Sequence, residues 1–196
     1  MVNTPRTLSQ PRLALAEFYR LPEGPPYYEY EDGILIEMNR PTPRHQQVLG
    51  EIYGELRSYL REHPMGLLLL EVNVELLGRK VYTPDLILTP QEQAGQPNPQ
   101  EALSVVPALI VEVLSPSTVG HDQVTKLNTY CQAGVPWHWI IDPEALTILE
   151  YRLAKDGHYM VHTAVERGQV FRPGLFPGLE IDLCALLGEE PAPAGS

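Results

Sequence analysis

Alternating hydrophobic and polar positions predict a β-hairpin near the start of the chain. Residues 27–31 and 34–38 are β-prone runs, and the dipeptide between them, Asp32-Gly33, suits the positive φ angles of a tight turn. A short apolar segment at 13–19 precedes the hairpin and predicts a helix. The tyrosine-rich hairpin is a candidate dimer surface, although aromatic strands are more often ordinary core edges.

Helical periodicity marks two longer segments. Apolar residues recur at helical spacing from Val48 to about His63, after a loop at 41–44, and Pro64 ends this helix. A second helix is predicted at 120–133, where a proline-containing turn follows.

The middle and the end of the chain have the patterns of β-strands. Residues 67–77 alternate between apolar and polar, and a turn at 78–80 leads into a second strand at 81–88. The segment 107–114 is apolar apart from Glu112, as expected for a central strand buried on both faces. Further strands are predicted at 137–142, 146–153 and 159–165, where the sheet ends, and a last apolar run lies at 179–187.

This order predicts an α/β fold of the mixed α+β kind, with a mixed central β-sheet flanked by helices and an N-terminal β-hairpin. A chain of 196 residues with 43% hydrophobic residues can bury its core in a single domain, expected at 1–187. The polar segment 89–104 joins two strands and is a candidate cover for a site. The small-residue end at 188–196 is expected to be disordered.

Charge and cysteine content restrict the partners and the compartment. The net charge of −11 argues against strong non-specific DNA binding, unless a local basic patch or bound divalent cations offset it. Cys131 and Cys184 lie in apolar surroundings without metal-ligand spacing, which predicts buried thiols in a reducing compartment. Residues 1–10 contain no apolar signal-peptide segment, and no apolar run reaches membrane-spanning length. We therefore expect a soluble, cytoplasmic protein.

Two carboxylates interrupt the predicted buried strands. Asp85 follows Pro84 in the second arm of the 67–88 hairpin, and Glu112 lies in the central strand. A buried charge is costly unless a cation compensates it, and a shared metal ion would do so. Alternatively, Asp85 caps a turn, or Glu112 pairs with an arginine such as Arg44 or Arg152. The two acids together favour the metal site.

His45 lies one turn before Val48 and Leu49, on the core side of the first long helix. A histidine at such a position is more often structural, with a hydrogen bond to a strand backbone. The alternative is a metal-binding or catalytic role.

Several motifs in this order resemble those of a known family. They are Tyr30-Glu31-Asp32-Gly33, Pro43-Arg44-His45, Pro84-Asp85-Leu86, Val111-Glu112-Val113-Leu114-Ser115-Pro116-Ser117, Asp122 with Lys126 and Tyr130, Gly134-Val135, and Trp139-Ile140-Ile141-Asp142-Pro143. The set resembles the Uma-type endonuclease family of the PD-(D/E)XK nuclease superfamily over roughly residues 27–183. The resemblance implies a restriction-endonuclease-like fold.

The resemblance also implies a metal site. Asp85 and Glu112, with the backbone carbonyl of Val113, would hold one or two Mg²⁺ (or Mn²⁺) ions, which prefer hard oxygen ligands. Such ions activate water and stabilise the leaving oxygen in phosphodiester hydrolysis. Leu114 occupies the position where the motif normally has its lysine. The resemblance suggests Lys126, on the following helix, as the replacement.

Helical spacing counts in part against Lys126. The residues Val124, Leu127 and Cys131 form an apolar stripe, and Lys126 projects nearly opposite to it. There it could form a solvated pair with Asp122. A catalytic role for Lys126 requires the helix to present that side to the cleft, and His45 could contribute as well.

The sequence supports two candidate functions, which belong to different classes of protein. The first is a Mg²⁺-dependent endonuclease that hydrolyses DNA through Asp85 and Glu112, as a homo-oligomer, with a dimer favoured. The second is a catalytically silent nuclease-fold module that acts through oligomerisation or a protein partner. Leu114 in the lysine position and the acidic charge motivate the second.

Overall fold

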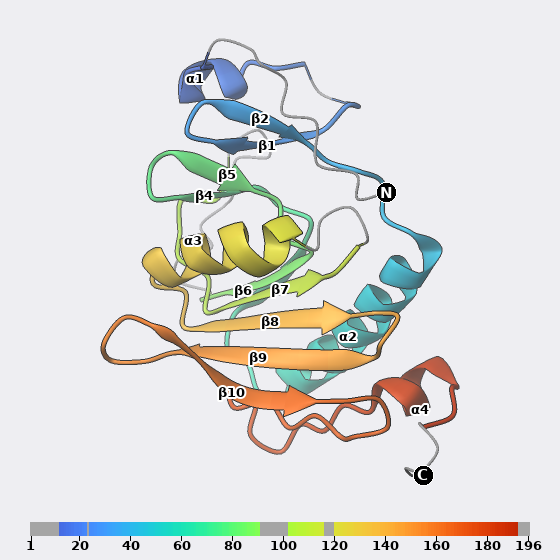
Figure 1. The fold of residues 1–196 in the computed structure, drawn as a ribbon. Coiled ribbons are helices and arrows are strands. Elements are labelled where there is room, and N and C mark those ends of the chain that lie inside the picture. The colour runs from blue at the N-terminus through green and yellow to red at the C-terminus, as the bar shows by residue number, and fades with distance from the viewer. Residues whose placement is uncertain (1–11, 23, 91–101, 116–119, 192–196) are drawn as a thin grey trace.

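The computed structural model describes residues 12–22, 24–90, 102–115 and 120–191, and their strands form two β-sheets (Figure 1). The predicted cover at 89–104 and the predicted tail at 188–196 lie for the larger part outside the described residues. Both therefore stay predictions.

The larger sheet has six strands in the order β10-β9-β8-β7-β6-β3. Strands β7 and β8 run parallel, and the other neighbours are antiparallel. The predicted mixed central sheet is therefore confirmed. Its strands are β3 (Leu67–Leu70), β6 (Leu86–Thr89), β7 (Leu109–Val113), β8 (Trp137–Asp142), β9 (Thr147–Leu153) and β10 (Tyr159–Val165).

The smaller sheet has four strands in the order β2-β1-β5-β4 and contains the predicted hairpin. Asp32 and Gly33 have φ angles of 48° and 95°, as a tight turn of this kind requires. Strand β1 pairs with β5, so the hairpin is attached to the middle of the chain. The strands are β1 (Tyr28–Glu31), β2 (Ile34–Glu37), β4 (Val74–Leu76) and β5 (Lys80–Tyr82).

Helices cover both faces of the larger sheet (Figure 1). Helix α2 (Pro43–Glu62) begins inside the predicted loop, because the Thr42 side chain caps it and proline suits a first turn. On the other face, a π-helical turn η1 (His121–Lys126) leads into α3 (Leu127–Gln132). This segment connects the parallel strands β7 and β8. Two shorter helices are α1 (Leu15–Phe18) and α4 (Leu183–Leu187).

Alternation along β7 divides the hydrophobic core between the two faces. Val111 and Val113 belong to the cluster that packs on α2, whereas Ile110 belongs to the cluster that contains Tyr130 of α3. Glu112 follows Ile110 by two residues and therefore faces α3. A carboxylate thus lies beside the hydrophobic cluster on the α3 side of the sheet.

The predicted pair of long strands at 67–77 and 81–88 is wrong in one respect. The pairing is present, but each arm is broken into two strands that belong to different sheets. One break lies at Glu71, whose φ is 49°, and the other at residues 83–85, where Pro84 lacks a backbone N–H. The Glu71 N–H donates to the Asp85 carbonyl at 3.2 Å, so the two breaks lie side by side. Asp85 is therefore in a junction between sheets rather than within a strand.

Both cysteines are free thiols, of which Cys184 is buried and Cys131 half-buried. Among the described residues, no helix combines the length and the apolar character needed to cross a membrane.

Candidate active site

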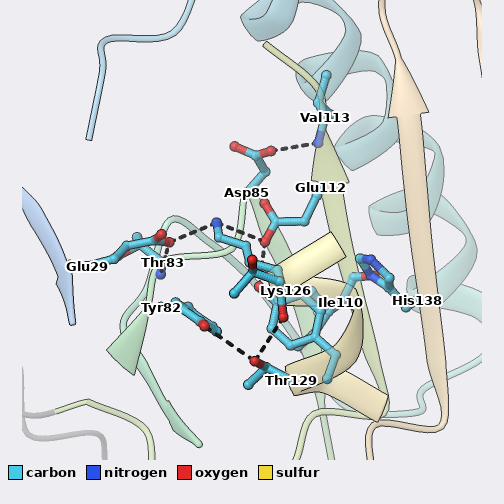
Figure 2. A network of polar contacts seen from close by, with 12 residues as sticks. Glu29, Tyr82, Thr83, Asp85, Ile110, Glu112, Val113, Lys126, Thr129 and His138 are labelled. Carbon is cyan, nitrogen blue, oxygen red and sulfur yellow. Dashed lines mark hydrogen bonds and ion pairs between the residues drawn. The ribbon is translucent and has the colours of Figure 1, made fainter. Parts of the chain in front are cut away.

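Asp85 contacts both the central strand β7 and helix α2. Its Oδ2 accepts a hydrogen bond of 2.7 Å from the Val113 backbone N–H (Figure 2). Its Oδ1 lies 3.2 Å from Nε2 of His45. The first contact links the sheet junction to β7, and the second links it to α2. The carboxylate of Asp85 therefore has a fixed place beside the strand that carries Glu112.

His45 is positioned by the first turn of α2, where its backbone N–H donates to Oγ1 of Thr42. Burial lowers the pKa of His45, but the hydrogen bond and the charge of Asp85 outweigh burial. The Val113 carbonyl and the charge of Glu71 also raise the pKa of His45, so the net shift is upward. The structural alternative for His45 thus has a physical basis, because the ring ties α2 to the Asp85 junction.

Glu112 is buried on the α3 side of β7, with 3% of its surface exposed. Its Oε1 accepts hydrogen bonds from the Tyr130 hydroxyl at 2.5 Å and from the Lys126 ammonium at 3.2 Å. Both donors come from the η1–α3 segment. The predicted arginine partners lie elsewhere, since Arg44 contacts Pro143 and Glu189. Arg152 lies over the Trp137 ring.

Lys126 faces the site and not the solvent. It is 5% exposed, whereas Val124 of the predicted apolar stripe is 60% exposed, so the predicted orientation of this helix is wrong. The π-helical turn explains the error, because it changes the angular spacing upstream of Lys126. The buried face is then formed by Lys126, Thr129 and Tyr130, at i, i+3 and i+4. The side chain of Asp122 lies outside the described part of the structure, but the burial of Lys126 contradicts a solvated pair.

A third carboxylate, which the sequence reasoning missed, belongs to Glu29 of β1. Glu29 is 4% exposed, and its Oε1 lies 2.8 Å from Nζ of Lys126. The ammonium therefore lies between Glu29 and Glu112, as Figure 2 shows. Glu29 alternates with tyrosines in a hairpin, a pattern that normally marks a solvent-facing strand side. No local signal identified it as buried.

Two aromatic residues complete the surroundings of Lys126. The Tyr82 ring centroid lies 5.5 Å from Nζ, close enough for a cation–π contact. The Tyr82 hydroxyl donates to Glu31 and lies 3.4 Å from Oγ1 of Thr129. Burial, together with the hydrogen bond to Glu31, raises the pKa of Tyr82 far above its ordinary value. Tyr82 therefore stays neutral and packs beside the Lys126 ammonium. The second aromatic residue is Tyr130, whose hydroxyl donates to Glu112.

The donor set fits a hard divalent cation in its chemistry. Asp85 and Glu112 offer carboxylate oxygens and Val113 a carbonyl, and Mg²⁺ typically needs only one or two carboxylates because it keeps several waters. Within the described ranges, no group of three or more histidine, cysteine, aspartate or glutamate side chains could hold a metal ion. Glu29 and Glu112 share the Lys126 ammonium, and Asp85 contacts His45. Three carboxylates thus face one lysine and one histidine, which leaves net negative charge that attracts a cation.

The mixed sheet, with one acid before β6 and another in β7, defines a nuclease-like α+β protein. A family model described as "Uma2: Putative restriction endonuclease" matches residues 15–184. The chain belongs to this family, as the motif resemblance predicted. A search of curated proteins finds no significant match.

A solved structure supports the fold assignment. It is the crystal structure of "a putative nuclease belonging to DUF820 from Anabaena variabilis ATCC 29413", to which this chain is similar with a TM-score of 0.72. The sequence identity is 21%, and the match covers 90% of this chain and 98% of the other. At this identity the likeness establishes the fold alone.

Proposed function

We propose that the protein is a divalent-metal-dependent endonuclease that hydrolyses phosphodiester bonds in DNA. In this proposal Asp85, Glu112 and the Val113 carbonyl hold Mg²⁺ or Mn²⁺. The observation that carries it is the position of Lys126, whose Nζ lies 3.2 Å from Oε1 of Glu112. A buried amine beside the acid of β7 supplies the group that Leu114 cannot. Family membership supports the same class of reaction.

The side chains have separable roles in this proposal. The metal, when bound, supplies Lewis-acid activation of water and stabilisation of the leaving oxygen. The Lys126 ammonium neutralises charge that develops on the phosphate and helps to orient the attacking water. The Val113 N–H and His45 keep the Asp85 carboxylate in place through both of its oxygens.

DNA as the substrate has to be reconciled with the net charge of −11. Repulsion from the phosphates predicts weak affinity in the absence of divalent ions, and binding that improves when such ions occupy the acidic site. We expect a homodimer, and the candidate surface is the edge strand β2 with the exposed Ile34, together with the exposed Tyr27 just before β1. Light scattering coupled to size-exclusion chromatography tests it. The cytoplasmic location also stays a prediction.

The decisive experiment measures cleavage of plasmid and single-stranded DNA with Mg²⁺ or Mn²⁺, and with EDTA as the blank. Asp85→Asn, Glu112→Gln and Lys126→Met should each reduce cleavage at least about a hundredfold, as loss of a metal ligand or charge-stabilising group does. Asp156→Asn and Lys155→Met, which alter exposed residues of the β9–β10 turn, should leave it unchanged.

Two results would overturn the proposal. Cleavage that persists in Asp85→Asn and Glu112→Gln would remove this site from the reaction. Wild-type protein that neither cleaves DNA nor binds divalent ions by calorimetry would favour the catalytically silent nuclease-fold module.

A further inference from the structure

Glu29 is a buried acid that lies outside both the quoted motifs and the proposed metal site. It lies in β1, in a different sheet from Glu112, and its surface is almost fully covered. Burying a carboxylate is unfavourable unless charged or hydrogen-bonded partners compensate it. The compensating groups are the Lys126 ammonium at 2.8 Å and the Thr83 backbone N–H at 3.0 Å, both at Oε1.

These two contacts give Glu29 a bridging position. Thr83 lies two residues before Asp85 in the sheet junction, and Lys126 lies at the end of η1. Glu29 therefore connects the helical segment that carries the amine to the loop that carries the first acid (Figure 2). A lysine side chain is a flexible four-carbon stem, so a fixed anion is needed to keep its charge at one place.

Glu29 and Glu112 differ in what else they have to do. Glu112 belongs to the proposed metal-binding set, and a carboxylate oxygen that turns to a metal ion interacts less with an ammonium. Glu29 stands outside that set, and the Thr83 N–H fixes its carboxylate independently of Lys126.

We infer that Glu29 is a positioning residue, which holds the Lys126 ammonium at the site when Glu112 serves as a metal ligand. This inference rests on the proposed roles of Lys126 and Glu112. It assigns the N-terminal hairpin to the active site in addition to any role as a dimer surface.

The chain has three lysines, Lys80, Lys126 and Lys155, which makes the position of the amine measurable without enzyme activity. Pulsed acetylation with acetic anhydride, mapped by peptide mass spectrometry in buffer with Mg²⁺ and again in buffer with EDTA, reports how accessible each amine is. Lys155 is exposed and serves as the internal reference. Glu29→Gln keeps an oxygen for the Thr83 N–H but removes the charge that attracts Lys126. Glu37→Gln, an exposed change in the same hairpin, is the matched control.

We expect Glu29→Gln to accelerate acetylation of Lys126 about tenfold relative to Lys155, the size of effect that loss of a charge-assisted hydrogen bond gives. Glu37→Gln should change it less than twofold. A folded Glu29→Gln protein with unchanged Lys126 acetylation in both buffers would overturn the inference. If Glu29→Gln does not fold, Glu29→Asp retains the charge on a stem one methylene shorter. It should raise Lys126 acetylation about threefold, and no rise would count against the inference.

Kinetics of DNA cleavage then separate this inference from the proposed function. Glu29→Gln should lower kcat about tenfold with KM for DNA changed less than twofold, because the lysine is displaced and substrate binding is not. An unchanged kcat would overturn the functional part of the inference. A wild-type protein without metal-dependent cleavage would refute the proposed function, and the acetylation result would still decide whether Glu29 positions Lys126.

Discussion

The backbone N–H of Val113 donates to Oδ2 of Asp85 at 2.7 Å, and this bond joins the sheet junction to the strand that carries Glu112. It explains how two acids that are far apart in the sequence come to lie on adjoining segments of the fold. The orientation of Asp85 depends on a backbone group of β7, which cannot move without disturbing the central sheet.

The first prediction concerns this bond. Asp85→Ala should lower the free energy of unfolding by about 1–3 kcal/mol, because the Val113 N–H loses its acceptor. Asp85→Asn retains a side-chain oxygen and should lose clearly less. Urea unfolding in EDTA measures both, with Asp156→Ala at an exposed turn as the control, which should stay within about 0.5 kcal/mol of the wild type. Equal losses in Asp85→Ala and Asp85→Asn would contradict this explanation.

The second prediction concerns Glu150, which is fully buried in β9. Burial raises the pKa of Glu150 above its ordinary value of 4.5, although hydrogen bonds from Gly174 and Trp139 act in the opposite direction. The folded-state pKa thus exceeds the unfolded value, so the stabilising contribution is complete below pH 4.5 and is lost as the pH rises through the folded pKa.

Glu150→Gln removes this titration and keeps an oxygen that can accept from Trp139. The stability of Glu150→Gln relative to the wild type should therefore increase steadily as the pH rises from 4.5 through the folded pKa. Chemical unfolding at a series of pH values measures the difference. Gln47→Ala, at an exposed residue of α2 that carries no titratable group, should give a difference that does not depend on pH. A flat profile for Glu150→Gln would show that Glu150 has no raised pKa.

Regular elements could be predicted because their patterns are local. The apolar run around Glu112 identified β7 as a central strand, and Asp32-Gly33 identified the hairpin turn. In both cases the residues themselves determine the backbone geometry and the buried face. The family motifs likewise brought Asp85, Glu112 and Lys126 to attention before their positions were known.

The parts that could not be predicted depend on tertiary structure. The chain passes from one sheet to the other at Glu71 and again before Asp85. The pattern of apolar and polar residues in a strand does not indicate where such a change occurs. The orientation of Lys126 follows from a π-helical turn, to which the regular angular spacing of an α-helix does not apply. Glu29 became buried only through the packing of the hairpin against a helix that lies about a hundred residues later.

The third prediction compares two buried tyrosines. The Tyr130 hydroxyl donates to the Glu112 carboxylate, whereas the Tyr159 hydroxyl donates to the Val135 carbonyl at 2.9 Å. A hydrogen bond to a charged acceptor contributes about 1.5–3 kcal/mol and one to a neutral acceptor about 0.5–1.5 kcal/mol. Tyr130→Phe should therefore destabilise the protein more than Tyr159→Phe does in urea unfolding. The reverse order would mean that other contacts dominate at one of the two sites.

The fourth prediction concerns the turn that holds β1, and with it Glu29, in place. Gly33 has a φ of 95°, and a Cβ at this position would lie 2.8 Å from Cβ of Arg12. Gly33→Ala should therefore lower the free energy of unfolding by about 1–3 kcal/mol. Gly54→Ala is the matched control, because Gly54 lies on the exposed side of α2, where an added methyl group would meet no other atom within 4 Å. There alanine should stabilise by about 0.5–1 kcal/mol, since it favours the helix.

Since β1 carries Glu29, a Gly33→Ala protein that folds should also show faster Lys126 acetylation, and Gly54→Ala should not. If both substitutions shifted stability in the same direction, backbone strain at the hairpin turn would not be the cause.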